Sequence, residues 1–186
     1  MVFVDVVLIA VAVGLLLGGR LGALAVLPFR GTWLAFAALA LQTAAFPLGS
    51  FPWHTPTDVA RALWLASYVL LAALLVRNRS ITGAPVVAFG LTSNVVAIIA
   101  NGGLMPVRAS ALAAEGRSYH VHQNSIQSLH PRLGWLVDRW AVPHWLPLGN
   151  VYSLGDVLIA AGIAIVIVTA MRADRQALAD VGAATG

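Results

Sequence analysis

Long apolar runs separated by short polar turns dominate the chain. Five runs are long enough, or nearly so, to cross a bilayer core, which takes about 17–25 helical residues. They cover residues 2–19, 32–48, 58–76, 84–101 and 153–171. The pattern predicts an all-α fold, in which the single domain of residues 1–186 is an integral membrane bundle of five transmembrane helices. The polar segment from about 102 to 152 is expected to form an extracytoplasmic loop cap between helices four and five.

The composition agrees with a membrane location. Hydrophobic residues make up 60% of the chain and charged residues only 10%, whereas a soluble domain carries about 25% charged residues. There is no cysteine, which removes disulfides, thiolate nucleophiles and cysteine metal sites. The first run lacks the basic residues that open a secretory signal, so we expect it to remain in the mature protein.

Arginine placement predicts the orientation. All eleven basic residues are arginine and most lie in turns, so they mark topology rather than a nucleic-acid surface, and no nucleic-acid partner is expected. The short turns between runs one and two, between runs three and four, and after run five hold Arg20, Arg30, Arg77, Arg79, Arg172 and Arg175. The positive-inside rule assigns these turns to the cytoplasm. We therefore expect the N-terminus and the cap outside and the C-terminus inside.

One stretch of the cap, "RLGWLVDRW" at residues 132–140, is amphipathic. Leu133, Trp135, Leu136 and Trp140 recur at roughly helical spacing. We expect the stretch to lie flat in the membrane interface, with Asp138 and the arginines toward water.

The start of the last run carries the pattern "SLGD". Ser153 followed three residues later by Asp156 is typical of a capping box, in which the two side chains bond to free amides of the helix start. The same carboxylate lies at the outer membrane boundary, where it also suits a functional role. Both interpretations of Asp156 stay open.

Two further polar residues interrupt apolar runs. Asp5 lies one turn into the first helix, where it either reaches the headgroups or supplies a second acid. Asn94 lies in the middle of the fourth run, and we expect it to hydrogen-bond to another helix, with Gln42 as the candidate partner. A contact with a ligand is the alternative for Asn94.

The fourth run ends in "ANGGLMP". Asn101 and Gly102 can adopt the left-handed conformation that ends helices, and Pro106 prevents the helix from resuming. The second glycine and the Met-Pro pair exceed what a stop requires, and two glycines allow a close approach of the backbone. We predict that this turn joins the start of the last helix in an outward-facing polar pocket. Its predicted ligand-binding residues are Asn94, Asn101, Gly102, Gly103, Met105, Pro106, Tyr119, His120, Tyr152, Ser153 and Asp156, with Tyr119 and His120 in a lid.

Histidines of the cap offer a weaker signal. His120 and His122 would share one side of an extended strand, with His130 and His144 further along. Their spacing fits no established zinc pattern. No metal site is predicted, and the sequence names no cofactor.

The motifs "ANGGLMPV", "YHV" and "LPLGNVYSLGDVLIAAG" occur in this order along the chain. With them the chain resembles a family of small multi-pass bacterial membrane proteins known only as domain of unknown function 5317. The resemblance covers the whole chain and implies a bacterial cytoplasmic (inner) membrane location. It implies no activity, because the family has none established.

The cap and last helix are also similar in layout to the end of lipoprotein signal peptidases, where an outer loop leads to an aspartate at the top of the last helix. That likeness implies two aspartates, one activating water and one serving as acid. The second acid of that family follows an asparagine by three residues, and Asn94 is followed at that distance by Ala97, which cannot act. The catalytic candidates are therefore Asp156 with Asp5 or His120.

No phosphate-binding loop, nucleophile–base pair or cofactor motif is recognisable. We expect a non-catalytic ligand-binding or accessory subunit of a membrane assembly. Its partners would be the lipid bilayer and either other membrane subunits or a small amphipathic ligand. The alternative is a membrane-embedded hydrolase that uses Asp156, and the sequence leaves enzyme status open.

Overall fold

The structure, a computed structural model, describes residues 2–46, 55–115, 125–146 and 148–184. Within these ranges the elements are, in order, α1 (Val2–Leu16), α2 (Gly22–Ala25), α3 (Thr32–Ala45), α4 (Thr57–Arg77), α5 (Ala84–Ala100), β1 (Met105–Arg108), α6 (Ala109–Glu115), β2 (Ser125–Ser128), β3 (Trp140–Val142), β4 (Asn150–Tyr152) and α7 (Leu154–Ala184). Each apolar run forms one long helix with nearly the predicted bounds. Helix α7 differs most, because it continues past the end of its apolar run to Ala184.

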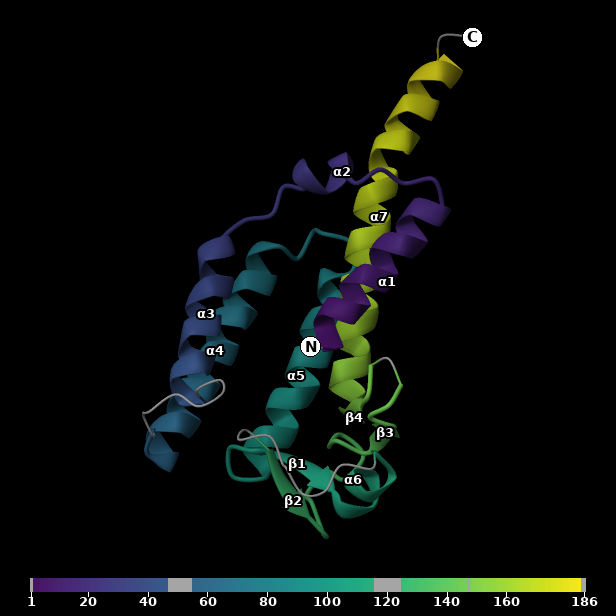
Figure 1. Cartoon of the computed structure of the whole chain (residues 1–186). Coiled ribbons are helices and arrows are strands. Elements are labelled where there is room, and N and C mark those ends of the chain that lie inside the picture. The colour runs from purple at the N-terminus through teal and green to yellow at the C-terminus, as the bar shows by residue number, and fades with distance from the viewer. Residues whose placement is uncertain (1, 47–54, 116–124, 147, 185–186) are drawn as a thin grey trace.

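The long helices pack in two groups. Helix α7 packs against both α5 and α1, and α3 packs against α4, while α4 and α5 share a smaller contact. Figure 1 shows α2 and the turn between α4 and α5 at one end of the molecule and the strands at the other. Successive long helices therefore alternate in direction.

Glycines allow α5 and α7 to approach closely. Gly83, which precedes α5, and Gly90 on α5 face Gly162 and Gly155 on α7. A Cβ added at Gly90 would lie 2.6 Å from the Gly155 carbonyl oxygen. The absence of side chains at these positions lets the two helix backbones come close. Helices α5 and α7 therefore pack closely, and the strands lie at one end of this pair.

Two asparagines fasten distant loops to helix ends. Asn78 is the C-cap residue of α4, and its side chain bonds the backbone N–H and C=O of Arg30 at 2.8 and 2.7 Å. Asn101 is the C-cap residue of α5, and it bonds the same two groups of Arg132, each at 2.9 Å. Each amide also donates to the carbonyl four residues earlier in its own helix. Both residues are therefore clamps between a helix end and a loop.

The segment between α5 and α7, here called the cap (residues 102–152), contains strands that the all-α prediction lacked. β1 pairs in parallel with β2, and β3 pairs antiparallel with β4. The prediction is therefore wrong in the cap, although the protein as a whole is mostly helical. Strands of three or four residues are too short to show a period of two in the sequence. They form here because backbone polar groups in a compact segment need partners.

Two of the long helices are long and apolar enough to cross a membrane, namely α4 over Thr57–Arg77 and α7 over Leu154–Ala173. Helices α1, α3 and α5 are apolar but shorter. Each of the five exposes large apolar side chains, among them Leu8, Phe36, Val69, Phe89 and Ile165. Length alone therefore supports two spans.

Candidate functional site

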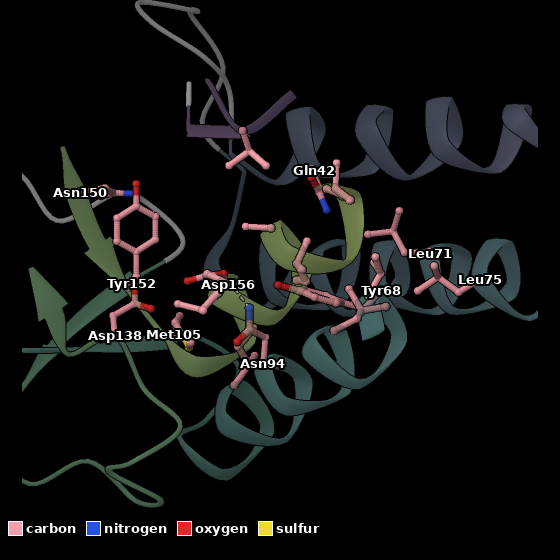
Figure 2. Close-up of a pocket in the computed structure, with 18 of the residues that line it drawn as sticks. Gln42, Tyr68, Leu71, Leu75, Asn94, Met105, Asp138, Asn150, Tyr152 and Asp156 are labelled. Atoms are coloured by element: carbon pink, nitrogen blue, oxygen red, sulfur yellow. Dashed lines mark hydrogen bonds between the residues drawn. The ribbon is translucent and has the colours of Figure 1, made fainter. Parts of the chain in front are cut away.

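A cavity of about 900 Å³ lies between the long helices and the cap. Its longest walls are apolar faces of α4, α5 and α7, which extend as far as Asn78 and Ile81 at the end away from the cap. Figure 2 shows Asn94 and Asp156 in the middle of the view, with Asp138 and Tyr152 on one side and Leu71 and Leu75 on the other. The cavity thus joins an apolar channel to a group of polar side chains beside the cap.

The polar group is built on the start of α7, where the capping box predicted from "SLGD" is confirmed. Ser153 Oγ accepts a hydrogen bond from the Asp156 N–H at 3.0 Å, and Asp156 Oδ2 accepts one from the Ser153 N–H at 3.0 Å. These two amides are therefore engaged within the helix start and are not available to an anion.

Asn94 of α5 completes the group. Its Nδ2 donates to Asp156 Oδ1 at 2.8 Å. Its Oδ1 lies 2.8 Å from Ser153 Oγ, and the same Oγ lies 2.8 Å from Asp156 Oδ2. The single hydroxyl proton of Ser153 can be donated to only one of these two acceptors at a time. The interhelical hydrogen bond of Asn94 is as predicted, but the proposed partner is wrong, because Gln42 donates to Ser67 Oγ at 3.1 Å instead.

The structure also explains why the third position of the "SLGD" motif, Gly155, is a glycine. A Cβ at this residue would lie 2.0 Å from Asn94 Oδ1. Only glycine leaves room for the asparagine to reach across to Ser153 and Asp156, both of which lie on the same turn. The "SLGD" motif is therefore accounted for by a helix cap that hydrogen-bonds to the neighbouring helix α5.

Asp138 is another acid of the cavity, whose walls also include Glu115. Its backbone is held from both sides, because its N–H donates to the Pro106 carbonyl at 3.1 Å and its C=O accepts from the Arg108 N–H at 3.0 Å. The Asp138 side chain lines the cavity, and its Oδ1 is buried without a hydrogen-bond partner among the described residues. Burial and the charge of Asp156 raise the pKa of this carboxyl from 3.8 to about 8. Asp138 is therefore largely protonated at neutral pH, beside a carboxylate that shares its cavity.

The sequence prediction for residues 132–140 is wrong. This stretch forms turns rather than a flat helix, with Leu136 and Val137 buried in the core and Asp138 directed into the cavity rather than to water. Pro131 and Gly134 favour turns over a helix interior and could have indicated this result. The prediction gave more weight to the helical spacing of the apolar residues.

The "NGGLMP" turn is largely structural. Gly102 and Gly103 have φ of 80° and 91°, which favour glycine, while Asn101 keeps a negative φ of −113° and acts as the clamp described above. Gly102 is exposed and Gly103 packs on the Arg61 side chain. Of the predicted ligand-binding residues in this turn, Met105 lines the cavity and Asn101, Gly102, Gly103 and Pro106 are not among its walls. Pro106 instead supplies the carbonyl that holds Asp138.

Two tyrosines also line the cavity, one predicted and one not. Tyr152 donates a short hydrogen bond to the Leu148 carbonyl. Burial, together with the charges of Asp156 and Asp5, raises the pKa of Tyr152, which places Asp5 near this end of the cavity. Tyr68 of α4 was not predicted as a cavity residue. In the sequence, a tyrosine inside an apolar run that lines a cavity cannot be told from one that only packs against another helix.

The remaining candidates lie elsewhere. Tyr119, His120 and His122 are outside the described residues. His130 and His144 are exposed, as are Trp135, Trp140 and Trp145, so none of the described tryptophans of the cap covers the cavity. Over the described ranges, no group of three or more His, Cys, Asp or Glu side chains is placed to hold a metal ion.

Comparison with known proteins gives a family and no activity. A family model described as "family of unknown function" (DUF5317) matches residues 26–168. This match covers α3 to α6, the four strands and the first half of α7, and it includes every residue of the polar group. No curated protein matches the chain. No solved structure matches it either.

Proposed function

The chain belongs to the family of unknown function DUF5317, and we propose that it is a bacterial inner-membrane protein that binds an amphiphilic molecule without transforming it. The observation that carries this proposal is the cavity of about 900 Å³, whose apolar walls lead to a polar group at the cap. Small-molecule sites typically have volumes of about 300–1,000 Å³. A molecule with one apolar chain and a polar head matches both parts of the cavity.

All five long helices cross the membrane in this proposal. The exposed apolar side chains on every one of them support it, because a soluble protein rarely leaves so much apolar surface in water. Helix α5 has 17 residues, at the lower limit of about 17–25. Helices α1 and α3 have 15 and 14 residues, so a locally thinner bilayer or their flanking residues must complete the crossing.

The orientation we propose has the cap outside. Contacts between the arginine-bearing turns support it, because the Arg20 N–H donates to the Met171 carbonyl and the Arg30 backbone bonds Asn78. All three turns thus lie at the end opposite the cap, which the positive-inside rule assigns to the cytoplasm. Single cysteines at the exposed positions Ser80 and Ser110 test this in a chain that has no cysteine. In intact cells an impermeant thiol reagent should label position 110. Labelling of position 80 alone would show that the protein has the opposite orientation.

Binding in the cavity is tested by filling its apolar part. Ala160 lines the cavity, whereas its neighbour Ala161 is exposed on the outer face of α7. Ala160→Phe should therefore displace a ligand, and Ala161→Phe is the matched control. The probe is N-dodecyl dansylamide, a neutral fluorescent amphiphile, added to the protein in phosphatidylcholine nanodiscs.

Energy transfer from tryptophan to the dansyl group reports binding, because Trp64 lies in the cavity wall. Wild type and Ala161→Phe should give a saturable transfer signal that Ala160→Phe loses. Equal signals from all three proteins would contradict binding in this cavity, as would a signal no larger than that of empty nanodiscs.

A second function is favoured by one observation, the presence of the Asp138 and Asp156 carboxyls in one cavity. In a hydrolase, Asp156 would take a proton from a water molecule attacking a peptide carbonyl, and Asp138 would give its proton to the leaving amine. Against it, Asp156 already accepts hydrogen bonds from Asn94 Nδ2 and the Ser153 N–H, and it competes with Asn94 Oδ1 for the Ser153 hydroxyl proton. The likeness to lipoprotein signal peptidases names the substrate to try, a lipid-modified precursor peptide. Cleavage that is lost in both Asp138→Asn and Asp156→Asn would favour the hydrolase, and intact peptide after incubation with wild type would count against it.

A further inference from the structure

The polar end of the cavity presents oxygen atoms to a ligand. Asp138 Oδ1 is buried and lacks a partner within the described chain, and its backbone bonds to Pro106 and Arg108 keep it in place. A buried acceptor that is left unpaired lowers stability, and it does so more strongly when the group is charged. The position therefore suits a hydrogen-bond donor on the ligand.

The ionisable groups around this end are acidic. The cavity walls include Asp138 and Asp156 and, among the described residues, no arginine or histidine. Arg108 is turned away, with its guanidinium bonded to the Gly134 carbonyl at 2.8 and 3.2 Å, and Arg139 lies over the Trp140 ring. The other titratable groups near this end are Glu115 of α6, Tyr152 of β4, Tyr68 of α4 and Asp5 of α1. A phosphate or carboxylate head would meet repulsion from the acidic side chains here.

The apolar part sets the shape of the rest of the ligand. The wall on α7 runs from Asp156 to Ile167, which is about 16 Å of helix at a rise of about 1.5 Å per residue. Apolar side chains of α4 and α5 line the same length, including Leu71, Leu75 and Val87. An extended alkyl chain of dodecyl length fits along this wall.

From these features, and on the basis of the amphiphile-binding function proposed above, we propose that the ligand is a long-chain amine. Its ammonium head donates to the free oxygen of Asp138 beside Asp156, and its chain lies between α4, α5 and α7. Charge complementarity selects this head over an alcohol or a carboxylate with the same chain. Because Asp138 is largely protonated in the unliganded protein at neutral pH, binding of an ammonium group releases a proton from this carboxyl.

The test compares dodecylammonium, dodecanol and dodecanoate as competitors of N-dodecyl dansylamide in phosphatidylcholine nanodiscs. The proteins are wild type, Asp138→Asn and the control Asp58→Asn. Asp58 is fully exposed at the start of α4, so the control makes the same chemical change outside the cavity. Affinities are expressed per amount of amphiphile in the bilayer, so that the three head groups can be compared, and the partitioning of each amphiphile is the same for all three proteins.

Wild type and Asp58→Asn should bind dodecylammonium at least about tenfold more tightly than dodecanol, as a hydrogen bond to a charged group allows. Asp138→Asn should lose that preference while still binding the dansyl probe. Proton uptake or release, measured at pH 7 in weak buffer, should show release on dodecylammonium binding in wild type and none in Asp138→Asn.

Other outcomes separate the two proposals. If the probe binds but the three competitors are equal, or if Asp138→Asn keeps the amine preference, the assignment of an amine is wrong and amphiphile binding stands. Tighter binding of dodecanoate overturns the amine as well. If no protein binds the probe above empty nanodiscs, the proposed function itself fails.

Discussion

Replacement of Asp138 by asparagine should make the protein more stable above pH 4. The pKa of Asp138 rises from 3.8 in the unfolded chain to about 8 in the folded protein. Between these two values the folded protein holds a proton that the unfolded chain has released, so the stability of wild type falls as the pH rises from 4 to 8. Asparagine keeps the shape of the protonated acid and has no proton to lose, so this loss disappears.

The size of the effect follows from the pKa difference. A change of one in pKa corresponds to about 1.4 kcal/mol, so the interval from 3.8 to pH 7 sets an upper limit of roughly 4 kcal/mol. Water that enters the cavity reduces the penalty of burying the charge, and we expect about 1–3 kcal/mol. For a chain of this size each kcal/mol shifts the unfolding midpoint by about 2–4 °C.

The assay is thermal unfolding in a mild detergent, followed by tryptophan fluorescence at pH 4 and pH 8. Asp138→Asn should match wild type at pH 4 and unfold several degrees higher at pH 8. Asp58→Asn, on the exposed start of α4, should show no such difference. Equal midpoints of wild type and Asp138→Asn at pH 8 would refute the assignment of Asp138 as a buried acid.

Three further variants test the polar group and the cap. Gly155→Ala should push Asn94 away from Asp156, because the added Cβ would lie 2.0 Å from Asn94 Oδ1; the thermal midpoint should fall by the equivalent of about 1–3 kcal/mol, and an unchanged midpoint would contradict the role of the glycine. Asn101→Ala should loosen the cap, because this side chain holds both backbone groups of Arg132; limited proteolysis should cut the cap faster than in wild type. Asp156→Asn should cost only about 0.5–2 kcal/mol, measured in the same unfolding assay, because the amide oxygen of asparagine can still accept the hydrogen bond from the Ser153 N–H; failure to fold would show that the charge itself is required.

The long helices were predictable because hydrophobicity along a helix is a local signal. Their bounds follow from the turns at residues such as Gly31 and Gly83, which precede α3 and α5 with φ of 78° and 98°. The capping box at Ser153 was equally local, since both partners lie within four residues. For Asn94 the sequence predicted an interhelical hydrogen bond but not its partner. A buried amide requires a partner on another helix, and nothing in the sequence says which helix supplies it.

The cap was not predictable in the same way. Asp138 reaches the cavity because Pro106 and Arg108, about thirty residues earlier, pair with its backbone. No period or motif in the sequence encodes that pairing. Asn101 similarly reads as a helix stop, whereas its bonds to Arg132 make it the fastening of the cap. Sites assembled from contacts between distant segments therefore escape a pattern-based prediction.

The most direct test of an amine-binding cavity is a photo-crosslinking map. A long-chain amine with a diazirine halfway along its chain would be bound to the protein in nanodiscs, irradiated, and its adducts located by mass spectrometry. Adducts should fall on apolar side chains of the cavity wall and decrease in Ala160→Phe, and the expected positions are Leu71, Leu75, Val87 and Ile163. Adducts confined to the exposed outer faces of the helices, at Phe36, Val69 and Phe89, would contradict the account.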